Sequence, residues 1–196
     1  MLFSEPFGGV IPGAHGAVLA ALLRTDAPLT GRQIHGLVSG GYSLWTVQEA
    51  LKALTKLGLI NSQTIGRAGV HSINEDHITI RPLRTLLDPF NSLIDAVREA
   101  VGDDVQAVIL FGSIARGEAQ MESDIDLAVI APAGWNGRSD LEDAVRARLG
   151  NGCDVLVLTP EDLTRPPRKI EPVVEEIIAD GVALVGSMPR ANSGSA

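Results

Sequence analysis

The sequence is poor in cysteine and in aromatic residues, and it has no long apolar run. Its 196 residues include one cysteine, Cys153, and only 4% aromatic residues. A single cysteine cannot form an internal disulfide, which fits a reducing cytoplasm. No apolar stretch approaches the roughly 20 residues of a membrane span, and the first residues lack the pattern of a signal peptide. We therefore expect a cytoplasmic protein with no membrane partner.

Positive charge is also scarce, and the charges are unevenly spread. The chain has 16 Lys and Arg against 24 Asp and Glu, a net charge of −8. Residues 1–80 contain five basic and five acidic residues, so the whole excess of negative charge follows residue 80. Because an acidic body repels nucleic acid, any contact with DNA has to be made by the first 80 residues.

The first 80 residues show the order helix, helix, helix, hairpin. Helices are expected over 13–24, from Thr30 as N-cap to residue 38, and from Ser43 as N-cap to residue 57. Short strands are expected over 59–64 and 70–73, with a glycine-rich turn between them. This order is the layout of a winged helix-turn-helix, which we predict for residues 1–80, followed by a linker over 81–88.

The helix that follows Ser43 is the candidate recognition helix of this module. Side chains outside its apolar stripe could enter a major groove, and the hairpin could reach phosphate. The predicted DNA-contacting residues are Ser43, Trp45, Thr46, Gln48, Lys52 and Arg67. A DNA-binding module usually has a clearly basic surface, and this region is neutral overall. A dimerisation or protein-docking role therefore stays open.

Residues 89–186 alternate helices with apolar strands. Helices are expected over 89–101, 139–149 with Ser139 as N-cap, and 171–179. Strands are expected over 105–111, 124–131, 153–158 and 182–185. The chain is thus predicted to be α+β, with a second domain built on a small mixed β-sheet flanked by helices. The Ser-, Gly- and Ala-rich tail over 187–196 is expected to be disordered.

Two short motifs in the second domain indicate phosphate and metal chemistry. Gly112 closes one strand and lets phosphate approach the main chain, and Ser113 adds a hydroxyl donor. Asp124 and Asp126 lie two apart at the head of the next strand, so their carboxylates share one face. Side-by-side anions favour a cation between them, and Mg²⁺ is usual where phosphates bind. Asp154 lies within an apolar strand and would complete a three-carboxylate site.

The pattern Gly-Ser, ten residues, Asp-x-Asp and a later strand Asp resembles the DNA polymerase β-like nucleotidyltransferase superfamily. The resemblance covers roughly residues 90–186, and the compact size is most similar to the minimal nucleotidyltransferases of prokaryotes. It implies Mg²⁺-dependent transfer of a nucleoside monophosphate from a nucleoside triphosphate to a hydroxyl, with loss of pyrophosphate. The implied site comprises metal ligands and catalytic acids Asp124, Asp126 and Asp154, and triphosphate ligands Gly112, Ser113 and Arg116.

Three functions remain open at this point. The first is a stand-alone transferase, and the second is an antitoxin that pairs with a helical toxin protein and nucleotidylates it, as the resemblance implies. The third is a winged-helix transcriptional regulator whose second domain only senses nucleotide or mediates dimerisation. The complete acid set favours catalysis, because a sensor has no need of three carboxylates. The acceptor, the base preference and whether the chain forms a homodimer cannot be derived from the sequence.

Overall fold

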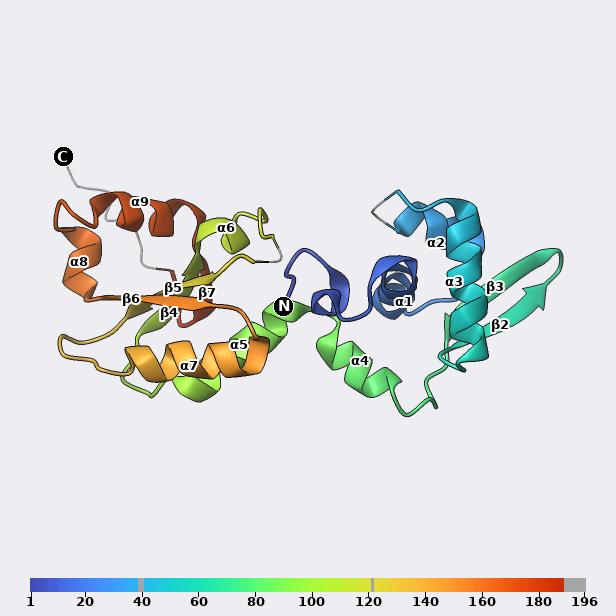
Figure 1. The fold of residues 1–196 in the computed structure, drawn as a ribbon, viewed down its shortest axis with the longest axis horizontal. Coiled ribbons are helices and arrows are strands. Elements are labelled where there is room, and N and C mark those ends of the chain that lie inside the picture. Colours follow the sequence, from blue (N-terminus) through green and yellow to red (C-terminus); the bar gives the residue numbers. More distant parts are fainter. Residues whose placement is uncertain (39–40, 121, 189–196) are drawn as a thin grey trace. The chain divides into compact units, whose positions relative to one another are not determined.

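The computed structural model describes residues 1–38, 41–120 and 122–188, and the chain divides into two compact units (Figure 1). The N-terminal unit is Glu5–Pro89, and the C-terminal unit comprises Met1–Ser4 together with the chain from Phe90 onward. Of the tail predicted to be disordered, residues 189–196 lie outside the described residues. No helix within the described ranges is long and apolar enough to cross a membrane.

The N-terminal unit combines helices with an antiparallel sheet in the order β1-β3-β2. Its elements are η1 (Pro6–Gly9), α1 (Gly13–Thr25), β1 (Leu29–Thr30), α2 (Gly31–Leu37), α3 (Leu44–Lys56), β2 (Ile60–Ile65), β3 (Ala68–Ile73) and α4 (Ile80–Leu86). Thr30 caps α2 in a capping box and Ser43 caps α3, at the two helix starts that the sequence predicted. Residues 81–88, expected to be a linker, lie in α4 and the turn after it.

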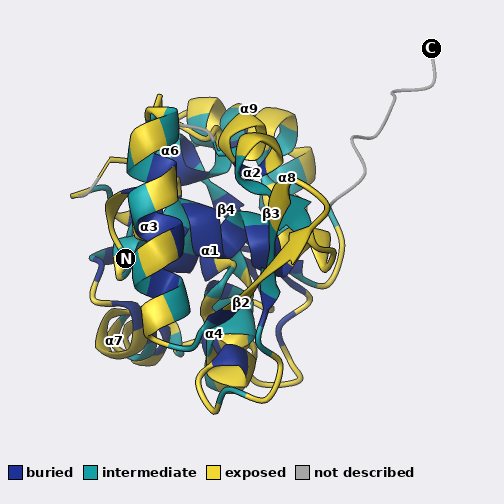
Figure 2. Ribbon diagram, turned by 90° about the vertical axis from the view of Figure 1, so that its right-hand side faces the viewer, coloured by how far each residue is buried: buried dark blue, intermediate teal, exposed yellow. Residues whose placement is uncertain are grey.

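One face of α3 is buried and the opposite face is exposed. Val47, Leu51 and Leu54 pack with residues of α1 into the core of the N-terminal unit. In β2, every residue after Ile60 is exposed. Figure 2 shows the exposed outer side of α3 and the exposed strand β2. The unit therefore presents a helix face and a hairpin that its own core does not use.

The C-terminal unit is built on a four-stranded mixed sheet in the order β6-β5-β4-β7. Its elements are α5 (Pro89–Ala100), β4 (Ala107–Phe111), α6 (Gly112–Ala115), β5 (Ile125–Ile130), α7 (Arg138–Leu149), β6 (Cys153–Leu158), α8 (Pro160–Thr164), α9 (Glu171–Asp180) and β7 (Val182–Val185). Strand β5 runs parallel to β6, whereas β4 runs antiparallel to both β5 and β7. The predicted mixed sheet flanked by helices is confirmed. The predicted cap Ser139 is wrong, because α7 begins at Arg138 with Gly137 at the N-cap position.

Helices cover both faces of this sheet (Figure 1). Helices α5 and α7 pack on one face, around a core that includes Leu110, Leu127 and Val155. Helix α9 packs on the other face, against alternate strand residues such as Ile109 and Ala128. Because strand side chains alternate between faces, Asp126 and Asp154 belong to the α9 face and the buried Cys153 to the α7 face. Burial is the largest cause that raises the pKa of the Cys153 thiol to about 12, so this cysteine is a packing residue.

The first residues of the chain anchor the turn that precedes β6. The amino group of Met1 donates to the main-chain oxygen of Leu149 and to Oδ1 of Asn151. The Asn151 side chain is buried, and its Nδ2 donates to the main-chain oxygens of Met1 and Ser123. Residues 1–4, placed by the sequence prediction in the first domain, therefore pack with the second unit. The network fixes the turn before β6 beside the residue that precedes Asp124.

Candidate active site

The predicted motifs meet at one edge of the four-stranded sheet. Strand β4 ends at this edge, where β5 and β6 begin, because β4 is antiparallel to β5 and β5 is parallel to β6. In the strand register, Asp126 lies opposite both Phe111 and Asp154. The Gly112-Ser113 turn directly follows Phe111. Adjacent strands therefore bring the Gly-Ser turn and two of the three acids side by side, as the sequence predicted.

Gly112 occupies a position that only glycine can fill. Its φ is +71°, a left-handed conformation that side chains rarely adopt. A Cβ built there would lie 2.2 Å from Oδ2 of Asp126, far inside van der Waals contact. The Asp126 carboxylate thus rests directly against the main chain of the Gly-Ser turn. This close approach of carboxylate and backbone positions Asp126 at the start of α6.

The Asp124 carboxylate lies close to the main chain of a second glycine, Gly152. Asp124 is exposed in the loop just before β5, and a Cβ on Gly152 would lie 2.1 Å from its Oδ1. The amide of the intervening Ile125 donates to the main-chain oxygen of Gly152 at 2.9 Å, which ties the start of β5 to the turn before β6. Gly152 therefore leaves room for the Asp124 carboxylate as Gly112 does for Asp126.

Asp126 is the acid whose protonation the site perturbs. Its side chain is half-buried, and burial is the largest cause that raises its pKa. The negative charges of Asp154, Asp124 and Glu176 raise it further, in that order, while Arg116 opposes them. The carboxylates are therefore close enough to repel one another, which is the condition that favours a bound cation.

The three aspartates do not, however, form a preassembled metal site. Within the part of the chain that the structure describes, no three His, Cys, Asp or Glu side chains are placed to hold one metal ion. Asp154 is exposed on β6, an edge strand, so the cost of a buried charge, on which its predicted role was based, does not apply. The donors suit Mg²⁺ in kind, since they are carboxylate oxygens. The metal role of the aspartates stays a prediction.

Arg116, predicted to bind phosphate, is engaged by two glutamates. Its Nε donates to Oε2 of Glu118 at 3.0 Å, and its Nη1 donates to Oε1 of Glu176 on α9. The hydrogen bonds that Arg116 donates to Glu118 and to Glu176 raise the pKa of its guanidinium. No sequence signal assigns Glu176 to this site, because it lies 50 residues after Asp126 in a helix and shares no motif spacing with the aspartates.

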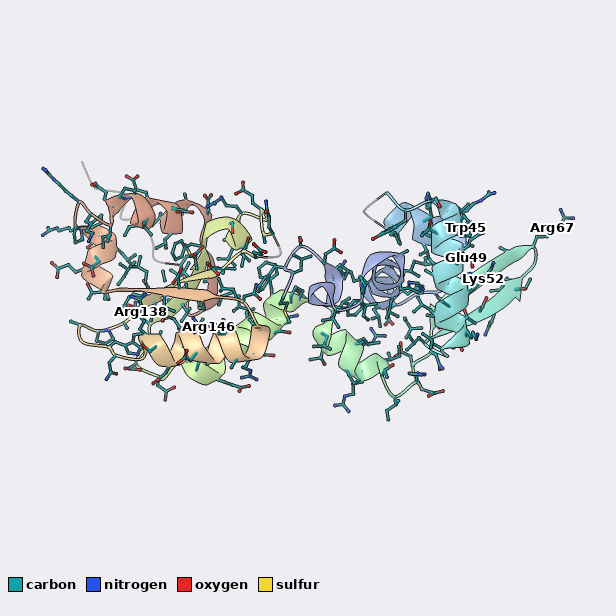
Figure 3. The ribbon with its side chains drawn as sticks, in the orientation of Figure 1. Trp45, Glu49, Lys52, Arg67, Arg138 and Arg146 are labelled. Carbon is teal, nitrogen blue, oxygen red and sulfur yellow. The ribbon has the colours of Figure 1, made fainter. Side chains whose placement is uncertain are left out.

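The predicted DNA-contacting residues divide into two groups in the N-terminal unit. A groove of about 980 Å³ runs between α2, α3 and the β2–β3 hairpin, and its lining includes Gln48, Lys52 and Arg67. Ser43, Trp45 and Thr46 lie outside its lining, and Trp45 is 70% exposed. Figure 3 shows Trp45, Glu49 and Lys52 along α3 and Arg67 at the tip of the hairpin.

The groove is basic, although the unit that contains it is not. Four cationic side chains line it, and no acidic residue is among the described lining residues; the four are Arg32, Lys52, Lys56 and Arg67. His71 also lines the groove, and its buried Nδ1 has no hydrogen-bond partner among the described residues. No sequence signal assigns Arg32 or Lys56 to this groove, because the groove forms only where the hairpin folds back toward α2 and α3.

The geometry of the C-terminal unit is accompanied by a sequence match to a known domain family. Residues 91–182 match the nucleotidyltransferase domain family, which confirms the resemblance over that segment. Over 99 residues the chain is 33% identical to a Methanocaldococcus jannaschii protein described as "Putative protein adenylyltransferase MJ1305". That alignment covers 47% of this chain and 64% of the relative, slightly less than two thirds of its length.

Solved toxin–antitoxin structures show a partial likeness to about 50% of the chain. One is a toxin–antitoxin crystal structure with AMP-PNP, 22% identical with a TM-score of 0.38, covering 50% of this chain and 73% of that one. Another is tri-AMPylated Shewanella oneidensis HEPN toxin in complex with MNT antitoxin, 23% identical with a TM-score of 0.35, covering 50% and 70%.

Proposed function

We propose that the C-terminal unit transfers a nucleoside monophosphate from a nucleoside triphosphate to a hydroxyl acceptor. The observation that carries the proposal is the sheet edge where the Asp126 carboxylate rests on Gly112. Asp124 lies in the loop just before β5, and Asp154 lies opposite Asp126 on the adjacent strand β6. The family match over residues 91–182 supports the same reaction class.

The residues of this edge have distinct roles in the proposal. The main chain of Gly112 and the hydroxyl of Ser113 hold the triphosphate, because no side chain at Gly112 obstructs its approach. Asp154 accepts the proton of the acceptor hydroxyl, whose oxygen then bonds to the α-phosphorus while the bond to pyrophosphate breaks. Asp124, Asp126 and Asp154 would hold Mg²⁺, which would neutralise phosphate charge and orient the displacement.

The proposed substrates are ATP and a protein hydroxyl. This choice is supported by the 33% identity to a relative described as a protein adenylyltransferase. In the antitoxin form of the proposal, which rests on the resemblance to minimal nucleotidyltransferases, the acceptor hydroxyl belongs to a helical toxin partner. Both forms use the same acids and differ only in the protein that receives the nucleotide.

Nucleotide binding tests the proposal without knowledge of the acceptor. Binding of AMP-PNP to the full chain, with and without Mg²⁺, is compared for wild type, Asp124→Asn/Asp126→Asn and the control Asp103→Asn/Asp104→Asn. The control removes the same charge from two exposed acids outside the sheet edge. We expect the site variant to lose about 10- to 100-fold in Mg²⁺-dependent affinity, as for changes in metal-site shells. Equal affinity of the two double variants would overturn the proposal.

We further propose that the N-terminal unit is a winged helix-turn-helix that binds DNA. Two observations favour this second function: the element order α1-β1-α2-α3-β2-β3, and the groove lined by four cations and no acidic residue among those described. In an acidic chain, phosphate contacts require positive charge to be concentrated locally. The groove provides this concentration between the candidate recognition helix α3 and the hairpin.

A pair of charge-matched variants tests DNA binding. Lys56→Gln/Arg67→Gln removes two cations from the groove, and Arg24→Gln/Arg81→Gln removes two exposed cations of the same unit that do not line it. Retention on duplex DNA is measured over a series of salt concentrations. The groove variant should weaken binding and reduce the salt slope by about 0.9 for each phosphate that is no longer neutralised. If the wild-type chain does not bind duplex DNA even at low salt, DNA binding is ruled out and a protein-docking role of the N-terminal unit is favoured.

A further inference from the structure

Arg116 connects three parts of the candidate active site. It follows the Gly-Ser turn at the end of α6, and its guanidinium reaches Glu118 in the next loop and Glu176 on α9. Glu176 is also close enough to Asp126 to contribute to its raised pKa. The ion pairs of Arg116 therefore lie at the same sheet edge as the aspartates, on the face of the sheet that α9 covers.

The two glutamates occupy the positions that a phosphate would need. A guanidinium binds phosphate or carboxylate most strongly through two parallel N–H donors along one edge of its fork. Nε donates to Glu118 and Nη1 donates to Glu176, so neither edge of the fork is wholly free. A bidentate phosphate contact by Arg116 thus requires that it leave at least one glutamate.

Glu176 is the less exposed of the two partners of Arg116 and the one held on a packed helix. Its side chain is 34% exposed, against 64% for Glu118, and less solvent means less screening of the pair. Glu118 lies two residues from Arg116 on one loop, whereas Glu176 lies 60 residues away on a packed helix. Helix α9 is fixed to the sheet by buried Val174 and Ile177, so the Glu176 backbone cannot easily follow Arg116 if the loop moves.

We infer that Glu176 is a positioning residue that competes with the triphosphate for Arg116. Arg116 pairs with Glu176 in the nucleotide-free protein and exchanges this carboxylate for phosphate oxygens when nucleotide binds. The inference rests on the proposed nucleotidyl transfer, in which phosphates approach the Gly-Ser turn beside Arg116. The exchange makes and breaks only ion pairs and hydrogen bonds, so no co-reactant is needed.

Removal of the Glu176 carboxylate should therefore tighten nucleotide binding. Glu176→Gln keeps the size of the side chain and removes the charge that restrains Arg116. An exposed ion pair of this kind corresponds to about a two- to fivefold change in an equilibrium constant, so AMP-PNP should bind about two- to fivefold more tightly. Glu118→Gln, the matched control on the same guanidinium, should have a smaller effect because that pair is more exposed.

Two further variants separate release of Arg116 from a simple loss of negative charge. Glu176→Asp keeps the charge on a shorter side chain, so it should also tighten AMP-PNP binding if the contact with Arg116 is what matters. In an Arg116→Gln background, the tightening by Glu176→Gln should largely disappear, which a double-mutant cycle on AMP-PNP affinity measures. Thermal unfolding of each variant verifies that the fold is retained.

The outcomes distinguish this inference from the proposed function. If wild type binds AMP-PNP and Glu176→Gln binds it equally or more weakly, the inference is wrong and the proposed function stands. Equal tightening with and without Arg116 would reduce Glu176 to a charge effect and also overturn the inference. A wild-type chain that binds no nucleotide overturns the proposed function, and the inference with it.

Discussion

The candidate sites of the two units contain clusters of opposite charge, and the electrostatic repulsion within the two clusters differs. In the C-terminal unit, Asp126 and Asp154 lie near the starts of adjacent strands, Asp124 lies in the loop before β5, and Glu176 approaches Asp126 from α9. In the N-terminal unit, four cations line a groove between exposed elements. The acids crowd one another enough to raise the pKa of Asp126, whereas the groove cations lie on surfaces that water can screen.

This difference indicates that the acidic cluster, and not the basic groove, needs surrounding residues to hold its side chains in place. A like-charge cluster at a sheet edge opposes folding, so residues around it have to hold it in place. Gly112 and Gly152 provide the space, and the Met1–Asn151 network fixes the neighbouring turn. The groove requires no such support, because its cations lie on exposed parts of α2, α3 and the hairpin, and Lys52 is paired with Glu49 on the same helix.

The largest expected effect comes from filling the space beneath Asp126. Gly112→Ala places a Cβ 2.2 Å from the Asp126 carboxylate on a backbone with φ of +71°. We expect a loss of about 1–3 kcal/mol in the stability of the C-terminal unit, from overpacking and backbone strain, together with loss of AMP-PNP binding. Chemical denaturation followed by Trp135 fluorescence, in a Trp45→Phe background, measures the stability.

Gly134→Ala is the matched control for this change. Gly134 also has a positive φ, of +89°, but a Cβ there would have nothing within 4 Å. Its substitution therefore adds backbone strain without a clash. If both alanine variants lose the same stability and both still bind AMP-PNP, the close contact between Asp126 and the Gly-Ser turn has no role.

A smaller and opposite effect is expected from Asp126 itself. Because its pKa is raised in the folded state, the folded protein resists ionisation of this group, and stability is lost as pH rises through the folded pKa. Asp126→Asn should stabilise the C-terminal unit at pH 7 by about 0.5–2 kcal/mol, at the expense of activity, as is common at strained functional sites. The gain should shrink as the pH falls and the wild-type carboxyl becomes protonated.

Urea unfolding at pH 7 and pH 4 measures this dependence, with Asp103→Asn as control. Asp103 is exposed and lies outside the sheet edge, so its substitution removes the same charge without relieving the cluster. A gain in stability at pH 7 that persists unchanged at pH 4, or an equal gain for Asp103→Asn, would contradict this prediction. Either result would show that repulsion among the aspartates at the sheet edge does not oppose folding.

Much of the fold could be predicted from the sequence because its signals are local. The bounds of β6 and β7 agree with the prediction at both ends, since turns and acidic or glycine residues bound these apolar runs. The Gly-Ser turn and the Asp-x-Asp pair were placed on adjacent strands for the same reason. The caps Thr30 and Ser43 were also found, because each contact lies within three residues of the cap.

What the sequence could not predict depends on contacts between distant segments. Glu176 lies near the three aspartates at the sheet edge only because α9 packs on the face to which Asp126 belongs. Arg32 and Lys56 join the basic groove only because the hairpin folds back toward α2 and α3. The metal site predicted from three aspartates depends on how their side chains are placed, which strand spacing does not determine.

The smallest expected effect tests whether acid acts oppositely on the two units. Burial lowers the pKa of His71, a groove residue, so the unfolded chain takes up its proton before the folded protein does. Its contribution to stability is therefore complete above the ordinary histidine pKa of about 6.5 and is lost as pH falls below it. Acidification should then weaken the N-terminal unit while it relieves repulsion at Asp126 in the other.

Substitution of His71 should remove part of that acid sensitivity. In His71→Gln, amide exchange in β2 and β3, followed by mass spectrometry at pH 7.5 and 5.0, should change less between the two pH values than in wild type. The difference should be about 0.5 kcal/mol, as for substitutions outside the core. His15→Gln, a substitution at an exposed histidine of α1, is the control. If both variants match wild type at both pH values, protonation of the His71 imidazole does not affect the stability of β2 and β3. The two units then differ in the charges at their candidate sites but not in the direction of their response to acid.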